Sequence, residues 1–155
     1  MKKLKIYLDT SVISMLDDSS LGIITRRFFD VVTQYNCELV ISEVVENEIN
    51  ETKANKREAI FYFLSTLNVM TIPYDDRSNN LAWKYVIEGV LTDNHIDDLM
   101  HVAYATVYEC DAIVSWNRKH IAKQSKIQKL NLCNLKYNYR SITICTPQEF
   151  IDNFI

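Results

Sequence analysis

The amino-acid sequence predicts an α/β fold, with a central, mostly parallel sheet of about five strands and helices on both faces. Short apolar runs rich in β-forming residues alternate with longer segments in which apolar residues recur at helical spacing. The chain has 155 residues, which suits one domain, and only two glycines and two prolines, which leaves little linker composition. We therefore expect residues 1–155 to form a single domain.

The predicted strands are short apolar runs that end at polar residues or at proline. The first ends abruptly at Asp9, and the third ends at Pro73. Because the carboxyl ends of parallel strands meet at one edge of a sheet, we expect reactive groups to gather after the first, second and fourth strands. The predicted strands are Leu4–Leu8, Glu38–Ile41, Asn68–Ile72, Ala112–Ser115 and Ser141–Cys145.

The segments between the strands have helical spacing of apolar residues. The best-marked helix start is near the C-terminus, where Thr146, Pro147 and Glu149 supply a capping residue, a first-turn proline and the glutamate of a capping box. The other predicted helices cover residues 21–35, 43–53, 56–67, 79–90 and 97–109, with a further basic helical stretch after the fourth strand.

Composition and charge exclude several classes of protein. No apolar run approaches the length of a membrane span, and the run at the N-terminus stops at Asp9, too early for a signal peptide. The four cysteines are scattered without a CxxC pair, so we expect reduced, mostly buried thiols rather than a zinc knuckle or a disulfide framework. These features predict a soluble, cytoplasmic protein.

The charges are distributed unevenly along the chain, although the net charge is only −3. No acidic residue lies between Asp111 and Glu149, a segment that contains seven lysines and arginines. This asymmetry suits either a basic surface beside an acidic pocket or a solvated helix face. The basic residues are Arg118, Lys119, Lys123, Lys126, Lys129, Lys136 and Arg140.

Asp9 is the first candidate site residue, because it directly follows the first predicted strand. Thr10 and Ser11 come next in the sequence. An aspartate in this position can be a helix N-cap, but a strand end in an α/β sheet is also where chemistry collects.

Three glutamates crowd into two helical turns after the second strand. Glu43 and Glu46 can favour the helix dipole or face solvent. Glu48 lies on a different face of the helix, flanked by Val45 and Ile49 of an apolar stripe, so it can point inward.

The helix predicted over 97–109 carries two more candidates, Asp97 and Asp98, at the head of an almost wholly apolar segment. We expect one of the two to cap the helix and the other to be free for chemistry, because a buried carboxylate is costly unless it is paired or bound to metal. His101 is interpreted as a helix-packing histidine. Asn117, just past the fourth strand, can be a turn residue or a weak oxygen donor.

Oxygen donors without a Cys/His cluster favour Mg²⁺ or Mn²⁺ over zinc. The three histidines, His95, His101 and His120, form no HExxH motif. Glycine is too scarce for a loop that cradles phosphates, which disfavours a P-loop or dinucleotide-binding fold.

Taken as a whole, the chain resembles the PIN-domain nucleases, and most closely the VapC-like toxin ribonucleases of type II toxin–antitoxin systems. The resemblance lies in five segments that occur in the family's order over nearly the whole chain. They are LDTSVIS, ISEVVENEI, DDLMHVAYA, DAIVSWNRKHI and ICTPQEFI.

The resemblance implies a catalytic set of Asp9, Glu48, Asp98 and Asn117, of which the three carboxylates hold the metal. Asn117 stands where the family often has aspartate, which weakens the case for a second metal position. The resemblance also implies supporting roles for Thr10 or Ser11, whose hydroxyls hydrogen-bond within the site, and it makes Asp97 a neighbour of that site.

The implied activity is endoribonucleolytic cleavage of RNA with Mg²⁺ or Mn²⁺ as cofactor. Arg118, Lys119 and Lys123 are the candidate contacts to the RNA backbone. Single-stranded or looped RNA is the expected substrate, because protein can reach its bases. The implied partners are a cognate antitoxin and a second copy of the chain, with no membrane.

Three alternatives stay open at this point. The first is a non-catalytic PIN-like module that binds RNA or protein, which Asn117 favours. The second is a phosphatase of the haloacid-dehalogenase type, whose chemistry normally needs an aspartate where this chain has Ser11. The third is an interaction domain whose acidic residues are only caps and surface charges.

Overall fold

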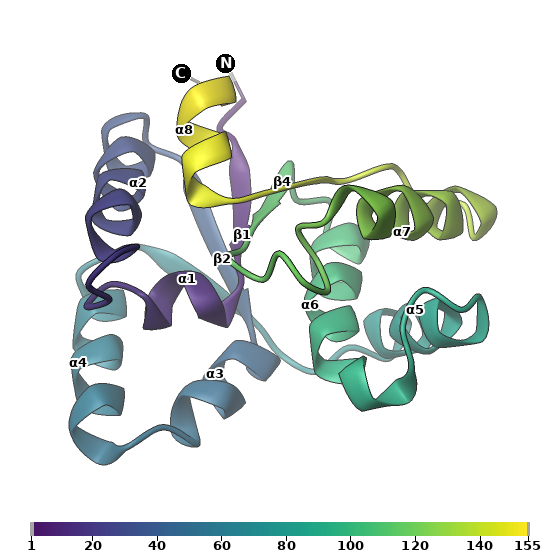
Figure 1. Cartoon of the computed structure of the whole chain (residues 1–155), viewed down its shortest axis with the longest axis horizontal. Coiled ribbons are helices and arrows are strands. Elements are labelled where there is room, and N and C mark those ends of the chain that lie inside the picture. The colour runs from purple at the N-terminus through teal and green to yellow at the C-terminus, as the bar shows by residue number, and fades with distance from the viewer. Residues whose placement is uncertain (1, 155) are drawn as a thin grey trace.

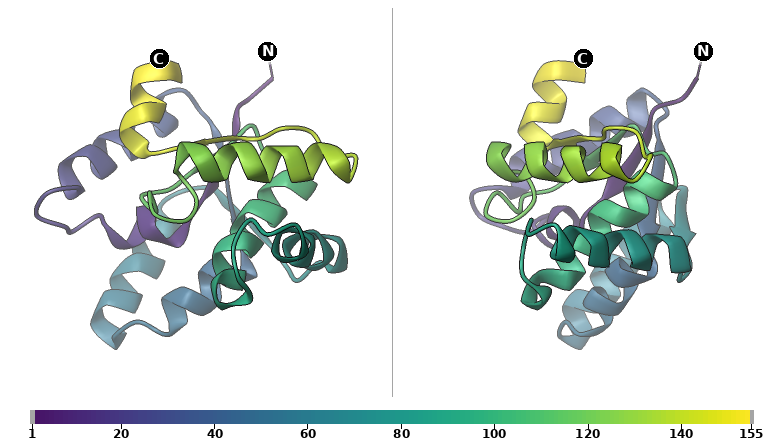
Figure 2. Two further views of the ribbon diagram at one scale, coloured as in Figure 1. Left: turned by 45° about the vertical axis from the view of Figure 1, so that its right-hand side comes forward. Right: turned by 90° about the vertical axis from the view of Figure 1, so that its right-hand side faces the viewer.

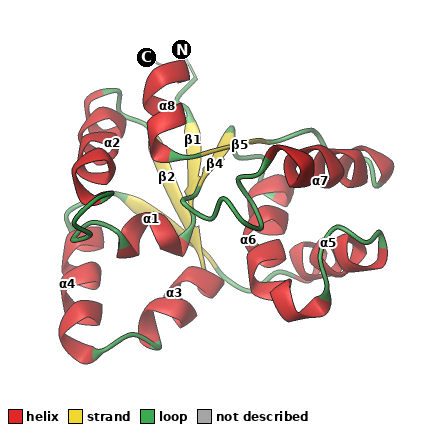
Figure 3. Ribbon diagram, viewed as in Figure 1, coloured by secondary structure: helices red, strands yellow, loops and turns green. Residues whose placement is uncertain are grey.

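The computed structural model describes residues 2–154 and contains a five-stranded sheet in the order β3-β2-β1-β4-β5 (Figures 1 and 3). Every neighbouring pair of strands is parallel. The prediction of a parallel α/β sheet is therefore confirmed. The strands are β1 (Lys5–Leu8), β2 (Glu38–Ser42), β3 (Val69–Ile72), β4 (Ala112–Val114) and β5 (Thr143–Cys145).

Strand β1 is the centre of the sheet and is buried from Ile6 to Leu8. Its register pairs Tyr7 with Val40 of β2 and with Ile113 of β4. The ladder continues one residue beyond β1, since the Asp9 amide donates to the carbonyl of Val114 at 3.1 Å. The backbone of Asp9 is thereby placed in the middle of the carboxyl edge of the sheet.

Helices cover the sheet in two layers. Helices α2, α4 and α8 lie on one side, and α5, α6 and α7 lie on the other (Figures 1 and 2). Aromatic side chains join the first layer, where Phe28 contacts Phe150 and Phe29 contacts Phe63 edge to face. The helices are α1 (Thr10–Ser14), α2 (Gly22–Gln34), α3 (Glu43–Asn50), α4 (Ala54–Ser65), α5 (Asp76–Ile87), α6 (Ile96–Val107), α7 (Gln124–Lys136) and α8 (Pro147–Phe154), with a 3₁₀ turn η1 (Asp93–His95).

Helix α6 is enclosed between the sheet and helix α5. Every residue from Leu99 to Val107 is buried, which agrees with the nearly continuous apolar sequence. His101 is the most polar side chain in this run and is only 1% exposed. A titratable group in such a place needs a hydrogen-bonding partner on each side.

Helix α1 and the start of helix α5 differ from the prediction in informative ways. Helix α1 follows β1 at once and was not predicted, because five residues are too few to establish a helical pattern. Helix α5 begins earlier than predicted, because the carboxylate of Asp75 accepts a hydrogen bond from the Ser78 amide at 2.8 Å and caps the helix.

The cysteines are free thiols, as predicted, and all except Cys37 are buried. None of the helices within residues 2–154 combines the length and hydrophobicity that crossing a bilayer requires.

The capping box predicted at helix α8 is present. The Glu149 amide donates to Thr146 Oγ1 at 3.2 Å, and the Thr146 amide donates to Glu149 Oε1 at 3.0 Å. Two amides that lack helical partners are thus satisfied reciprocally.

Replacing Thr146 by valine should lower the free energy of unfolding by about 1 kcal/mol, because it removes the cap and keeps the side-chain volume. Thr146→Ser keeps the hydroxyl and should cost clearly less. Urea denaturation of both variants measures the difference. An equal loss in the two would show that the methyl group, and not the cap, is what matters here.

Candidate metal centre

Asp9 is almost completely buried, with 4% of its surface exposed. It occupies the N-cap position of α1, yet its side chain does not cap the helix. Instead, Asp9 Oδ2 accepts hydrogen bonds from Ser11 Oγ at 2.7 Å and from Ser115 Oγ at 2.6 Å. The interpretation of Asp9 as a simple capping residue therefore fails, because its carboxylate is directed into the protein and held there.

Glu48 reaches the same point from helix α3. Ser42 caps this helix directly after β2, its hydroxyl accepting from the Val44 amide at 3.2 Å, so the helix starts at the carboxyl edge of the sheet. Glu48 Oε1 accepts from Thr10 Oγ1 at 2.8 Å and lies 2.6 Å from His101 Nε2. Of the three glutamates in this helix, Glu48 is the one that contacts the surroundings of Asp9.

His101 joins the two carboxylates. Its Nε2 lies 2.6 Å from Glu48 Oε1 and 3.3 Å from Asp9 Oδ1, so those two oxygens are at most about 6 Å apart. On the other side of the ring, Nδ1 is 2.8 Å from the Tyr7 hydroxyl, which in turn is 2.7 Å from Ser42 Oγ. Because a carboxylate only accepts hydrogen bonds, Nε2 must carry the proton.

The interpretation of His101 as a packing histidine was therefore wrong in its essential point. The ring is buried, but it is buried in the acidic site. The sequence does contain a signal for this, since Asp98 and His101 are three residues apart on one helix and so share a face. The contact of His101 with Glu48, 53 positions away, has no such signal.

Electrostatics couples the three groups. Burial alone would lower the pKa of His101, but the charge of Asp9 and the hydrogen bond to Glu48 outweigh it and raise that pKa. Burial alone would raise the pKa of Glu48, yet the hydrogen bonds from His101 and Thr10 and the charge of His101 lower it. The charge of Asp9 and the hydrogen bond to Glu48 thus favour the charged form of His101.

Asp98 lies in the first turn of α6, with 24% of its side chain exposed. Burial and the negative charge of Asp9 raise the pKa of Asp98. The charges of His101 and His120 and a hydrogen bond from the Asn117 side chain act in the opposite direction. Neither Asp98 nor Asp97 caps the helix, contrary to prediction, because the N-cap residue is His95 and no side chain caps that end. Asp97 is exposed, and among residues 2–154 no contact places it in the site.

Asn117 lies beside Asp98 on the loop after β4. Its side-chain oxygen accepts a hydrogen bond from the backbone amide of His120 at 3.0 Å, and its backbone amide donates to Ser115 Oγ at 2.9 Å. Asn117 thus closes a turn, as one of its two interpretations expected, and its side chain also favours the charged form of Asp98. Its role as an oxygen donor to a metal stays a prediction.

The donor set fits a hard divalent cation. Within the described chain, the ion-pair partners of Asp9, Glu48 and Asp98 are all histidines, so no lysine or arginine neutralises these carboxylates. Burial and the charge of Asp9 raise the pKa of Asp98, so ionising Asp98 beside Asp9 is unfavourable without a further cation. Carboxylate oxygens are the ligands that Mg²⁺ and Mn²⁺ prefer.

The basic residues between Asp111 and Glu149 lie in different surroundings. Lys136 and Arg140 pair with Glu88 and Glu109, at 2.6 and 3.6 Å. Three other lysines lie nearer the carboxylates. Lys119, Lys123 and Lys126 line a depression of about 700 Å³ together with His95 and His120. Of the predicted RNA contacts, Lys119 and Lys123 thus lie beside the site, whereas Arg118 lies over the ring of Trp116.

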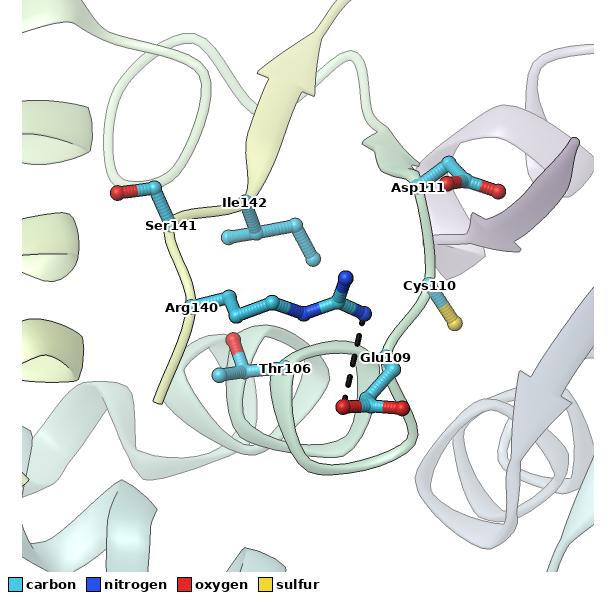
Figure 4. A pocket seen from close by; sticks show the side chains of 7 residues that line it. All are labelled: Thr106, Glu109, Cys110, Asp111, Arg140, Ser141 and Ile142. Carbon is cyan, nitrogen blue, oxygen red and sulfur yellow. Dashed lines mark ion pairs between the residues drawn. The ribbon is translucent and has the colours of Figure 1, made fainter. Parts of the chain in front are cut away.

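A smaller cavity, of about 110 Å³, lies at the opposite edge of the sheet, where β4 and β5 begin. Figure 4 shows Arg140 crossing this cavity toward Glu109, in an ion pair whose side chains are about two-thirds exposed. A surface pair of this kind contributes little to stability. The cavity contains none of the candidate site residues.

Comparison with known proteins establishes the fold. One similar structure is a chain of VapBC2 from Rickettsia felis, solved bound to a DNA fragment from the promoter, with 12% sequence identity, a TM-score of 0.61 and coverage of 92% of this chain and 98% of that one. Another is VapC20 of Mycobacterium tuberculosis, a toxin that cleaves the sarcin–ricin loop, with 11% identity, a TM-score of 0.60 and coverage of 74% and 92%.

No family model and no curated protein matches the sequence. At this level of identity the likeness concerns the fold alone. The chain has the PIN-domain, VapC-like fold that its sequence predicted.

Replacing Asp98 by asparagine should stabilise the metal-free protein at neutral pH and raise its melting temperature by roughly a few degrees. The pKa of Asp98 is raised on folding, so its ionised form costs stability above that pKa. At a pH well below about 4, the usual pKa of an aspartate, the carboxyl is neutral in both folded and unfolded chains, and the gain should disappear. Thermal melts in chelator across this pH range measure the effect.

Asp97→Asn is the matched control, because it removes the same charge from the same helix turn at an exposed position. It should change the melting temperature little. A loss of several degrees in Asp98→Asn would contradict the assignment and show that Asp98 serves the structure.

Proposed function

We propose that this protein is a metal-dependent endoribonuclease that hydrolyses phosphodiester bonds in RNA, and that it is the toxin of a toxin–antitoxin pair. The observation that carries the proposal is the meeting of buried Asp9 with Glu48 around His101, with Asp98 beside them, at the carboxyl edge of a parallel sheet. Three acidic groups placed together without lysine or arginine are costly for stability, which is typical of a site kept for function.

Asp9, Asp98 and Glu48 are the residues that would hold Mg²⁺ or Mn²⁺. Such an ion, when bound, acidifies and orients water and offsets negative charge on a phosphate. Ser11 and Ser115 hold one oxygen of Asp9 and leave Oδ1 facing His101. Thr10 and His101 fix Oε1 of Glu48 in the same way. These hydrogen bonds limit the rotation of the carboxylates and so preorganise the ligands.

His101 acts in this proposal as a positioning residue. It is buried and is anchored by the Tyr7 hydroxyl, so it reaches Glu48 and Asp9 rather than solvent. Its hydrogen bond and charge lower the pKa of Glu48, which favours the ionised carboxylate that binds cations.

The depression lined by Lys119 and Lys123 is the proposed path of the RNA backbone. It also contains His120, whose Nδ1 is 3.1 Å from Asp98 Oδ2, so the depression reaches the site. Lysines that contact phosphates bind without regard to sequence and make affinity depend on salt.

The role of toxin rests on the shared fold, since VapC20 is a toxin that cleaves RNA of the sarcin–ricin loop. A toxin of this kind needs a partner that blocks it, and an antitoxin arginine placed among the carboxylates would supply the charge of a cation. We propose such an antitoxin, a homodimeric assembly and a cytoplasmic location for this chain on the same basis.

One alternative keeps a specific observation in its favour. Asn117 contributes no negative charge next to Asp98, which suits a PIN-like module that binds RNA or protein without cleaving it. Cleavage assays separate the two functions.

Asp9→Asn, Glu48→Gln and Asp98→Asn should each reduce cleavage of a structured RNA in Mg²⁺ or Mn²⁺ by at least about 100-fold, because each removes a proposed ligand. Chelator should have the same effect on the wild type. Gel analysis of the products gives the rates. Matched controls are Glu46→Gln, on the same helix as Glu48, and Asp97→Asn. Equal loss in the controls, or no metal-dependent cleavage by the wild type with any RNA, would leave the binding module as the better account.

Expression of the wild type should arrest bacterial growth, and Asp9→Asn should relieve the arrest at equal protein level. Co-expression with the small protein encoded next to the gene should yield a stable complex that cleaves no RNA. Full activity within that complex would contradict the antitoxin assignment while leaving the nuclease assignment intact.

A further inference from the structure

A second group of potential metal ligands adjoins the carboxylate site. It consists of His95 in η1, Asp98 in α6 and His120 in the loop after β4. Nδ1 of His120 lies 3.1 Å from Asp98 Oδ2, and Nδ1 of His95 lies 3.9 Å from the same oxygen. Two stretches of the chain, the junction of η1 with α6 and the loop after β4, therefore bring donor atoms close together.

The spacing of these atoms suits a small cation. Ligands about 2.0–2.1 Å from a tetrahedral zinc ion lie about 3.4 Å from one another. The two measured separations, 3.1 and 3.9 Å, fall on either side of that value, and all three donor atoms lie within 4.8 Å of one another.

The local structure holds the two rings in place. The Asn117 side-chain oxygen accepts from the His120 amide, and the Asn117 carbonyl accepts from the amides of Ile121 and Ala122 at 3.1 and 2.8 Å. The rings of His95 and His120 lie against each other, with centroids 4.0 Å apart. Asn117 thus shapes the loop that presents His120 to Asp98.

The chemistry of this group differs from that of the carboxylate site. Two imidazole nitrogens and one carboxylate favour Zn²⁺ or Co²⁺, whereas Mg²⁺ and Mn²⁺ prefer oxygen ligands. Three protein ligands leave a coordination position for water or a phosphate oxygen. The side chains of His95, His120 and Asp98 are 35%, 21% and 24% exposed, and both histidines line the depression beside the site, so an ion can reach them.

We propose that His95, Asp98 and His120 form a binding site for a transition-metal ion such as Zn²⁺, in preference to Mg²⁺, adjacent to the proposed Mg²⁺ or Mn²⁺ position and sharing Asp98 with it. A role for this ion in cleavage rests on the proposed function, but the binding site itself does not.

The test is Zn²⁺ titration of the full-length, chelator-treated protein by calorimetry in excess Mg²⁺. The wild type should bind one Zn²⁺, and His95→Ala and His120→Ala should each weaken that binding at least about tenfold while Mg²⁺ affinity stays unchanged. Co²⁺ serves as a spectroscopic probe, because its absorption reports nitrogen ligation and should be lost in both variants. Asn94→Ala, next to His95 and exposed, is the matched control and should bind as the wild type does.

Two results would overturn the proposal. One is unchanged Zn²⁺ affinity in the double variant His95→Ala/His120→Ala, with its fold checked by circular dichroism. The other is loss of Zn²⁺ binding in Asp9→Asn alone, which would place the ion among the carboxylates. Zinc binding that depends on the histidines, in a protein that cleaves no RNA, would refute the proposed function and leave the metal site standing.

Discussion

The burial of Asp9 is the constraint on which the rest of the site depends. A carboxylate taken almost completely out of water costs several kcal/mol unless it is hydrogen-bonded and its charge is compensated. The surrounding residues meet both needs, because two serine hydroxyls donate to Oδ2 and the His101 ring faces Oδ1. Since Asp9 ends the central strand, this compensation must come from the neighbouring elements at the same edge.

His101 connects the compensation of the buried Asp9 charge to the rest of the fold. It is placed by α6, a helix buried on all sides between α5 and the sheet, so its ring has little freedom. Tyr7, in the middle of the central strand, holds the other ring nitrogen and is itself held by Ser42 at the end of β2. A chain of hydrogen bonds therefore runs from the cap of α3 through the core to Glu48, and the same His101 nitrogen lies 3.3 Å from Asp9 Oδ1. Such a network is stable only when every member is satisfied, and within residues 2–154 no buried side-chain polar atom lacks a partner.

Asp98 is the group that this arrangement satisfies least. It is shared between two environments, with Asp9 and His101 on one side and His95 and His120 on the other. Its raised pKa shows that the attractions from the histidines do not fully offset burial and the charge of Asp9. A bound cation would remove this imbalance. Asp98 lies between oxygen donors, which suit Mg²⁺ or Mn²⁺, and nitrogen donors, which suit Zn²⁺.

The sequence by itself determined the fold class, the strands and the position of Asp9 at the end of the first strand, whereas the choice of Glu48 and Asp98 among their acidic neighbours came from the family resemblance. Alternating apolar periods specify a parallel α/β sheet, and such a sheet brings its strand ends to one edge. The capping box at Thr146 was equally local and equally predictable. Helix α1 was too short to leave a pattern.

Only the tertiary structure decided that His101 bridges Asp9 and Glu48, that Asp97 is outside the site, and that His95 and His120 meet at Asp98. Those contacts depend on how α3, α6 and the loop after β4 pack, and local periodicity carries no information about side chains that meet across 20 to 100 positions of sequence.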